Sequence, residues 1–90
     1  MFSISFTNQF KKDYSKASTK TIDIQKLHKA FEILENTGTL PVEKYKTHLL
    51  KGNFTGHYEA HIKPDWLLIW LKYETEIRLV RLGSHSELFK

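Results

Sequence analysis

The chain has 90 residues, carries 14 Lys and Arg against 10 Asp and Glu, and contains no cysteine. This length predicts a single domain over residues 1–90, and the missing cysteines exclude disulfides and thiolate zinc sites. A hydrophobic content of 40% excludes a disordered tail. Neither a signal peptide nor a membrane-spanning apolar run is visible, so we expect a cytoplasmic protein.

The net charge of +4 lies in the first half of the chain. Residues 1–51 hold nine lysines against five acidic residues, whereas residues 52–90 are balanced. A basic half is typical of a polyanion-binding surface, and the alternative is a solvated lysine-rich helix face. On charge alone we favour the solvated face.

Residues 2–6 alternate apolar and polar side chains, which predicts a half-buried strand. Thr7 or Asn8 then caps a helix whose apolar stripe is Phe6, Phe10, Tyr14 and Ala17, and residues 18–20 break it. A second helix is expected over residues 21–35, with the stripe Ile24, Leu27, Phe31 and Leu34 and a stop at Asn36-Thr37-Gly38. Residues 39–52 are irregular and predict a long, functional loop.

Three strands follow, at residues 58–62, 66–73 and 77–82, with turns at Lys63-Pro64-Asp65 and Glu74-Thr75. Residues 66–73 are almost continuously apolar, as in a strand buried on both faces. The element order β-α-α-β-β-β predicts an α+β domain in which two N-terminal helices pack on one face of a twisted antiparallel sheet.

Five histidines are a high count for this length. His28 lies beside the apolar stripe of the second helix, and we expect it to be structural. His57 and His61 are four residues apart, which on a strand is about 13 Å and too far for one ion. The pattern therefore does not predict a zinc site.

Imidazole exchanges protons near neutral pH, so His48, His61 and His85 are candidates for acid–base chemistry. RNA cleavage without a metal needs a base, a cation for the phosphorane and an acid, and His, Asp, Lys and Arg side chains can supply them. Glu59 and His61 share one strand face, and strand parity places Arg81 near His85. The structural alternatives are that Asp65 only favours its turn and that Arg81 pairs with Glu59 or Glu76.

Three segments together resemble the YafQ-type mRNA interferase toxins of the RelE/ParE superfamily. They are YKTHLLKG at residues 45–52, YEAHIKPDWLLIW at 58–70 and RLGSHSELF at 81–89. The resemblance covers most of residues 45–89, and the helical first half fits the same layout. It implies a RelE-like fold and a type II toxin that inhibits translation.

The resemblance also implies a ribosome-dependent endoribonuclease that cuts mRNA in the A site through 2′-OH attack, with no metal and no cofactor. Expected partners are the ribosome, mRNA and a cognate antitoxin of the RelB/DinJ type. The implied catalytic residues are His48, His61, Asp65 and His85. The resemblance also implies Trp66, Phe89 and Arg81, which we expect to bind RNA, and we add Lys51 as a further RNA-binding candidate.

We expect His85 to be the general acid and His48 the general base. His61 and Asp65 either share the base role or orient the substrate and the other imidazoles. Lys51 and Arg81 would hold phosphate charge, and Phe89 would stack on a base.

Two functions of another kind stay open. One is a non-catalytic module that binds RNA or the ribosome, and the other is a RelE-fold toxin that acts on a protein such as gyrase. Three titratable histidines argue against the second alternative.

Overall fold

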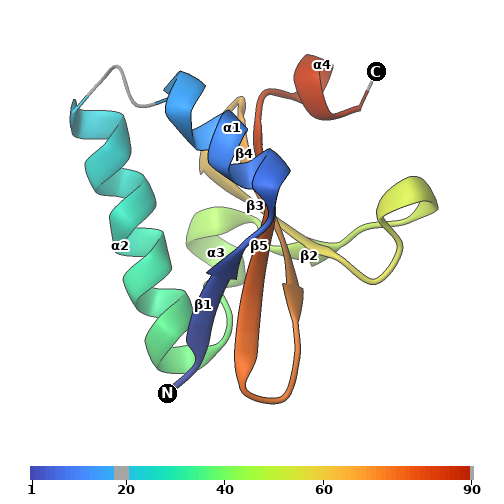
Figure 1. The fold of residues 1–90 in the computed structure, drawn as a ribbon. Coiled ribbons are helices and arrows are strands. Elements are labelled where there is room, and N and C mark those ends of the chain that lie inside the picture. Colours follow the sequence, from blue (N-terminus) through green and yellow to red (C-terminus); the bar gives the residue numbers. More distant parts are fainter. Residues whose placement is uncertain (18–20, 90) are drawn as a thin grey trace.

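The computed structural model describes residues 1–17 and 21–89 of the chain (Figure 1). Its elements, in order, are β1 (Ser3–Phe6), α1 (Asn8–Ala17), α2 (Thr21–Thr37), α3 (Val42–Tyr45), β2 (His48–Leu49), η1 (Gly52–Phe54), β3 (Tyr58–Lys63), β4 (Trp66–Lys72), β5 (Glu76–Gly83) and α4 (His85–Leu88). The helices and strands expected from the sequence are present, and the break expected at residues 18–20 lies outside the described residues. Within the described ranges, no helix is both long and apolar enough to cross a membrane.

The five strands form one sheet in the order β1-β5-β4-β3-β2. The hairpin pairings of β3, β4 and β5 are antiparallel, as expected, but β1 pairs with β5 in parallel, from Ser3 opposite Glu76 to Phe6 opposite Leu79. The sheet is therefore mixed rather than wholly antiparallel. Hairpin turns can be read from local sequence, whereas the pairing of the first strand with the last depends on the whole fold.

The expected loop over residues 39–52 contains two short elements. α3 has four residues, and β2 has only His48 and Leu49, which pair with β3. Elements of this length are too short to produce a hydrophobic period, so the sequence pattern cannot reveal them. The result is an added edge strand that carries His48 to the sheet.

Strand β4 is the centre of the fold, and its residues from Leu67 to Trp70 are fully buried. The expectation of a strand buried on both faces is confirmed. On one face, Leu68 and Trp70 pack with residues of α1 and α2, and Figure 1 shows both helices on the same side of the sheet. On the other face, Leu67 and Ile69 pack with Leu88 of α4.

A β-bulge interrupts the pairing of β4 with β5. Ile69 lies opposite Arg81 and Trp70 opposite Leu79, so Val80 is the extra residue. After the bulge, Leu82 returns to the helix-covered core together with Leu79. Simple alternation along β5 therefore fails between Leu79 and Arg81, and because β5 ends at Gly83 the strand parity does not extend to His85 in α4.

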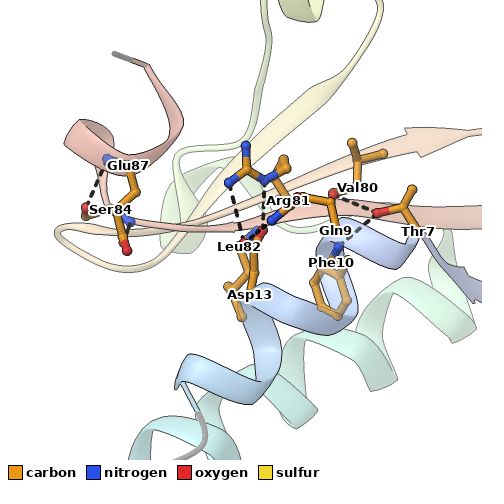
Figure 2. Close-up of polar contacts among 9 residues, drawn as sticks. All are labelled: Thr7, Gln9, Phe10, Asp13, Val80, Arg81, Leu82, Ser84 and Glu87. Carbon is orange, nitrogen blue, oxygen red and sulfur yellow. Dashed lines mark hydrogen bonds and ion pairs between the residues drawn. The ribbon is translucent and has the colours of Figure 1, made fainter.

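Thr7, the residue just before α1, binds the outer edge of β5 where β1 ends (Figure 2). The backbone N–H of Thr7 donates to Leu79 (3.0 Å), and its hydroxyl donates to the carbonyl of Val80 (2.9 Å). The same hydroxyl accepts the N–H of Phe10 (2.9 Å), so Thr7 serves as the expected helix cap. The bulge is thus held from the side by the first turn of α1.

Asp13, one turn and a half further along α1, is buried and binds the end of β5 (Figure 2). Its carboxylate accepts from Nε of Arg81 (2.8 Å), Nη2 of Arg81 (3.4 Å) and the N–H of Leu82 (3.0 Å). Arg81 therefore pairs with Asp13, and not with Glu59 or Glu76. This ion pair joins the first helix to the last strand.

We expect Asp13→Asn to destabilise the fold by about 3 kcal/mol, because it leaves the Arg81 charge half-buried without its partner. Burial alone would raise the pKa of Asp13, but the bonds from Arg81, Leu82 and Gln9 outweigh it and hold the pKa below its usual value. The stabilisation is complete above the unfolded-state pKa of about 3.9 and is lost as pH falls through the lower folded-state value.

Urea unfolding of the wild type and of Asp13→Asn between pH 3 and pH 7 measures this contribution to the free energy of unfolding. The difference in unfolding free energy between wild type and Asp13→Asn should shrink as the pH falls. A difference that stays constant across this range would contradict the role of the ionised carboxylate.

Candidate active site

The candidate site lies on the sheet face opposite α1 and α2. Along β3, Ala60 and Ile62 face the helix-covered core, and Glu59 and His61 alternate with them. Glu59 lies opposite Ile69 in the pairing with β4, on the face of the smaller hydrophobic cluster. The expectation that Glu59 and His61 share a face is confirmed.

His48 reaches this face through the left-handed backbone of Lys46 (φ 53°), which turns the chain from α3 into β2. The imidazole Nδ1 of His48 donates to the carbonyl oxygen of Lys46 (2.8 Å). Its Nε2 lies 3.3 Å from Oε1 of Glu59, the residue opposite it in the sheet. The ring is half exposed, with one nitrogen fixed and the other directed at the carboxylate.

His85 is the first residue of α4, and a capping box fixes the start of that helix. The hydroxyl of Ser84 accepts the N–H of Glu87 (3.3 Å), and the carboxylate of Glu87 accepts the N–H of Ser84 (2.8 Å; Figure 2). These reciprocal bonds orient the helix that presents the His85 side chain.

Asp65 in the β3–β4 turn binds His85 twice. Its Oδ1 accepts from Nδ1 of His85 (2.9 Å) and from the backbone N–H of His85 (3.1 Å). These two hydrogen bonds, the side-chain one first, lower the pKa of Asp65. Asp65 therefore does more than favour its turn, because it fixes which nitrogen of His85 is free.

The three predicted histidines come together. The ring centroids of His48 and His61 are 6.5 Å apart, and those of His61 and His85 are 5.8 Å apart. Nε2 of His61 lies 3.9 Å from Oε1 of Glu59. The structure thus gathers residues from β2, β3 and α4, which are up to 37 positions apart in the chain, around one carboxylate.

Glu59 is the residue that sequence reasoning missed as part of the site. It is only 3% exposed, and its Oε2 has no hydrogen-bond partner among the described residues. The available signal was an acidic residue at an inward-facing strand position, two residues before His61. Burying an ionised carboxylate costs folding free energy unless the group is paired with a cation or hydrogen-bonded.

Phe89 lies beside the cluster, as expected for a base-stacking residue. Its ring is 42% exposed and lies 6.2 Å from the His85 ring and 5.7 Å from the ring of Phe54. Phe54, in η1, is a further aromatic residue that the sequence did not single out. Lys51, the residue just before η1, is exposed.

The other predicted residues make different contacts. Trp66 packs against the helix-covered core, and Arg81 forms an ion pair with Asp13. His28 contacts the hydroxyl of Tyr14 through Nε2 (2.8 Å), and His57 packs edge-on against Phe54. The structural reading of His28 fits this contact.

The cluster can perform two kinds of chemistry. Lys46 and Asp65 offer only acceptor oxygens, so the bound Nδ1 of His48 and of His85 must carry its proton, and Nε2 is the atom left for acid–base exchange. In addition, donor atoms of Glu59, His61 and His85 all lie within 4.8 Å of one another, so this trio could hold a metal ion. The sequence spacing suggested only His57 and His61 as a possible pair of metal ligands, and His57 is not part of this trio.

Comparison with known proteins adds three findings. The family model described as "Bacterial toxin of type II toxin-antitoxin system, YafQ" matches residues 2–90. The chain is 37% identical to the mRNA interferase toxin YafQ of Escherichia coli K12 over 87 residues, which are 96% of this chain and 94% of that protein.

Among solved structures, the E. coli DinJ–YafQ complex matches with a TM-score of 0.85 and 35% identity over the whole of both chains. A metal-bound toxin from Helicobacter pylori matches with a TM-score of 0.86 and 40% identity over 99% of this chain and all of that one.

The fold is therefore that of the small RelE-like toxins. Within that class, the chain belongs to the YafQ family of bacterial toxins from type II toxin–antitoxin systems. The family resemblance carried by the three sequence segments is confirmed.

Proposed function

We propose that this toxin is an endoribonuclease that cleaves mRNA in the ribosomal A site by metal-independent acid–base catalysis. The observation that carries the proposal is the convergence of His48, His61 and His85 on one face, with Nδ1 fixed in two of them. The choice of mRNA as the substrate is supported by the E. coli relative, which is named an mRNA interferase and is similar over 96% of this chain. Such a reaction belongs in the cytoplasm, where translation takes place.

His85 is the proposed general acid. Because Asp65 holds Nδ1–H, Nε2 is the atom that gives its proton to the departing 5′-oxygen. The carboxylate of Asp65 stabilises the imidazolium before the transfer, as in other His–Asp pairs. The half-exposed position of His85 lets a phosphodiester approach this nitrogen.

His48 is the proposed general base. Its Nε2 takes the proton of the 2′-OH while the 2′-oxygen attacks phosphorus and the bond to the 5′-oxygen breaks, which leaves a 2′,3′-cyclic phosphate and a 5′-OH end. Glu59, 3.3 Å from that nitrogen, stabilises the imidazolium that forms. His61, beside both, shares the base role or orients the other rings.

RNA binding is proposed for the surface around the cluster. A groove of about 280 Å³ next to His61 is lined by three lysines from α3, its C-terminus and β3: Lys44, Lys46 and Lys63. A second groove shares Lys44 and extends to Lys26 and Lys29 of α2. The basic half of the chain thus reaches the histidines, which favours an RNA-binding face over a merely solvated one.

The exposure of individual side chains indicates which of them can contact RNA. Phe89 stacks on a base, a contact worth about 1–3 kcal/mol, and Lys51 holds phosphate charge. Arg81 contributes less phosphate binding, since Asp13 offsets its charge. Trp66 supports the start of β4, next to the turn that carries Asp65. A DinJ-type antitoxin is the proposed neutralising partner, by analogy with the solved E. coli complex.

The decisive experiment is primer extension on mRNA translated in the presence of purified protein. Discrete in-frame cuts support the proposal. Ribosome binding with uncut mRNA would indicate a non-catalytic module. Growth arrest without ribosome binding and without mRNA cleavage would indicate a protein target.

His85→Gln should abolish growth arrest and lower the cleavage rate by about 10²- to 10⁴-fold, because it removes the proton donor and keeps the side-chain size. The exposed position predicts an unchanged fold, which circular dichroism and thermal melting check. His28→Gln is the matched control and should remain toxic. Full toxicity of His85→Gln would show that another group is the acid.

Cleavage should persist in millimolar EDTA, because every step uses imidazole, carboxylate or ammonium groups of the chain. The rate is measured on ribosome-bound mRNA with magnesium restored to the level that keeps ribosomes assembled. A loss of cleavage after removal of tightly bound transition metals alone would contradict acid–base catalysis without a metal.

Changing Lys44, Lys46 and Lys51 together to Ala should weaken ribosome binding and flatten its salt dependence by about 2 in the slope of log K against log salt. Lys72→Ala, at the far end of β4, is the control and should leave the slope nearly unchanged. An unaltered slope in the triple variant would remove this segment from the interface.

A further inference from the structure

A row of aromatic rings continues from His85 beyond the three histidines. The ring centroid of Phe89 lies 6.2 Å from that of His85. Phe54 follows at 5.7 Å from Phe89, and His57 follows at 5.5 Å from Phe54. We call His57, Phe54 and Phe89 the aromatic strip. A role in base stacking is already proposed for Phe89, whereas Phe54 and His57 have no role in the proposed reaction.

The rings of the aromatic strip are available to a ligand. Phe89 is 42% exposed, and Phe54 and His57 are partly exposed. Phe54 meets both neighbours edge-to-face, with interplanar angles of 81° to Phe89 and 80° to His57. An edge-to-face pair covers the face of only one of its two rings, so the aromatic strip keeps ring faces on which a planar group can stack.

The loop that carries Phe54 and His57 is held by its own hydrogen bonds. The N–H of Thr55 donates to the carbonyl of Gly52 (3.1 Å), and the N–H of His57 donates to the carbonyl of Phe54 (3.0 Å). Gly52 and Gly56 have φ angles of 72° and 86°, a backbone conformation that favours glycine. This tight turn presents both rings in a fixed arrangement, which lowers the entropy cost of binding a ligand.

The charge around the aromatic strip suits an anionic ligand. Residues 51–57 contain the exposed Lys51 and no acidic side chain. Aromatic rings beside a positive charge are the pattern by which proteins bind single-stranded nucleic acid, because the rings stack on bases and the cations attract phosphates. The aromatic strip therefore matches a single-stranded RNA.

The roles proposed for His85 and His48 set the direction of the RNA along the aromatic strip. The 5′-oxygen that His85 protonates belongs to the nucleotide on the 3′ side of the cleaved bond. The 2′-OH that His48 deprotonates belongs to the nucleotide on the 5′ side, and the His48 ring neighbours that of His61 (6.5 Å). Because the aromatic strip begins beside His85, it lies on the 3′ side of the cleaved bond.

We propose that Phe54 and His57 form a second base-binding subsite, on which the second base on the 3′ side of the cleaved bond stacks, while Phe89 stacks on the first. The position of these bases relative to the cut rests on the proposed function. The subsite adds a contact to mRNA that no catalytic group supplies. It holds the nucleotides after the cut in place and thereby orients the leaving 5′-oxygen toward His85.

The stacking test uses ribosomes programmed with mRNA that carries 2-aminopurine, whose fluorescence falls when it stacks. Methylation of every 2′-OH in the A-site codon and the next codon prevents cleavage, and the probe is placed in turn at each of these positions. The full-length protein, freed of its antitoxin, should quench the probe at the second position after the cut, which primer extension on unmodified mRNA locates.

Phe54→Leu keeps an apolar side chain for packing but has no ring. It should abolish this quenching and weaken the affinity, measured by titration, about 5-fold or more. Phe54→Trp should restore the quenching, because indole offers a larger stacking face. Circular dichroism and thermal melting check that the variants fold. Quenching that persists in Phe54→Leu would overturn the subsite.

Two further substitutions complete the set. His57→Leu should weaken the same quenching, whereas His57→Phe, which keeps a ring, should retain it. Tyr73→Leu is the matched control, because Tyr73 is an aromatic residue that is 44% exposed in the turn between β4 and β5. It should quench the probe as the wild type does.

An abasic nucleotide separates stacking from a purely structural role of the ring. Removal of the second base after the cut should slow cleavage by the wild type about 5-fold or more and have little further effect on Phe54→Leu. Equal slowing of the wild type and of Phe54→Leu would show that the ring acts only through packing, which would contradict the subsite.

The two assays distinguish a failure of the subsite from a failure of the proposed function. Cleavage without quenching that depends on Phe54 would overturn the subsite and leave the cleavage mechanism standing. Quenching that depends on Phe54, without cleavage of unmodified mRNA, would support the subsite and contradict the proposed function. Quenching confined to positions before the cut would overturn the assigned direction of the RNA.

Discussion

The burial of β4 on both faces is the constraint on which the rest of the molecule depends. Leu68 and Trp70 need cover on one side, and α1 and α2 supply it. Leu67 and Ile69 need cover on the other side, where no long helix is present in the described chain. The segment around η1 and the four-residue helix α4 provide that cover through Leu50, Phe54 and Leu88. The packing that completes the core thus brings His85 to His61.

The end of β5 determines how accurately α4 is placed. Thr7, which caps α1, and Asp13 within α1 occupy hydrogen-bonding groups of β5 beyond the point where β1 stops. This support stabilises the bulge at Val80, which returns Leu82 to the core three residues before His85. The contacts of Thr7 and Asp13 with β5 therefore help to position α4, which carries His85. The ion pair between Arg81 and Asp13 is one of these contacts.

Much of this arrangement follows from local patterns, and the rest depends on tertiary contacts. Alternation along β3 correctly predicted that Glu59 and His61 share a face, and the family motifs selected the histidines that converge. Parity along β5 could not relate Arg81 to His85, because the strand ends at Gly83, and the bulge at Val80 leaves no trace in sequence. The two-residue strand at His48 has no detectable period. Burial of Glu59 needed β2 and β4 on either side of it, which only the folded sheet supplies.

Fixed hydrogen bonds around the histidines explain how the proposed site can move protons. An acid–base pair works only if each imidazole presents one known nitrogen, and Asp65 achieves this for His85 by holding Nδ1–H. Glu59 is central to this chemistry, because its carboxylate lies beside His48 and His61 and stabilises the imidazolium that forms there.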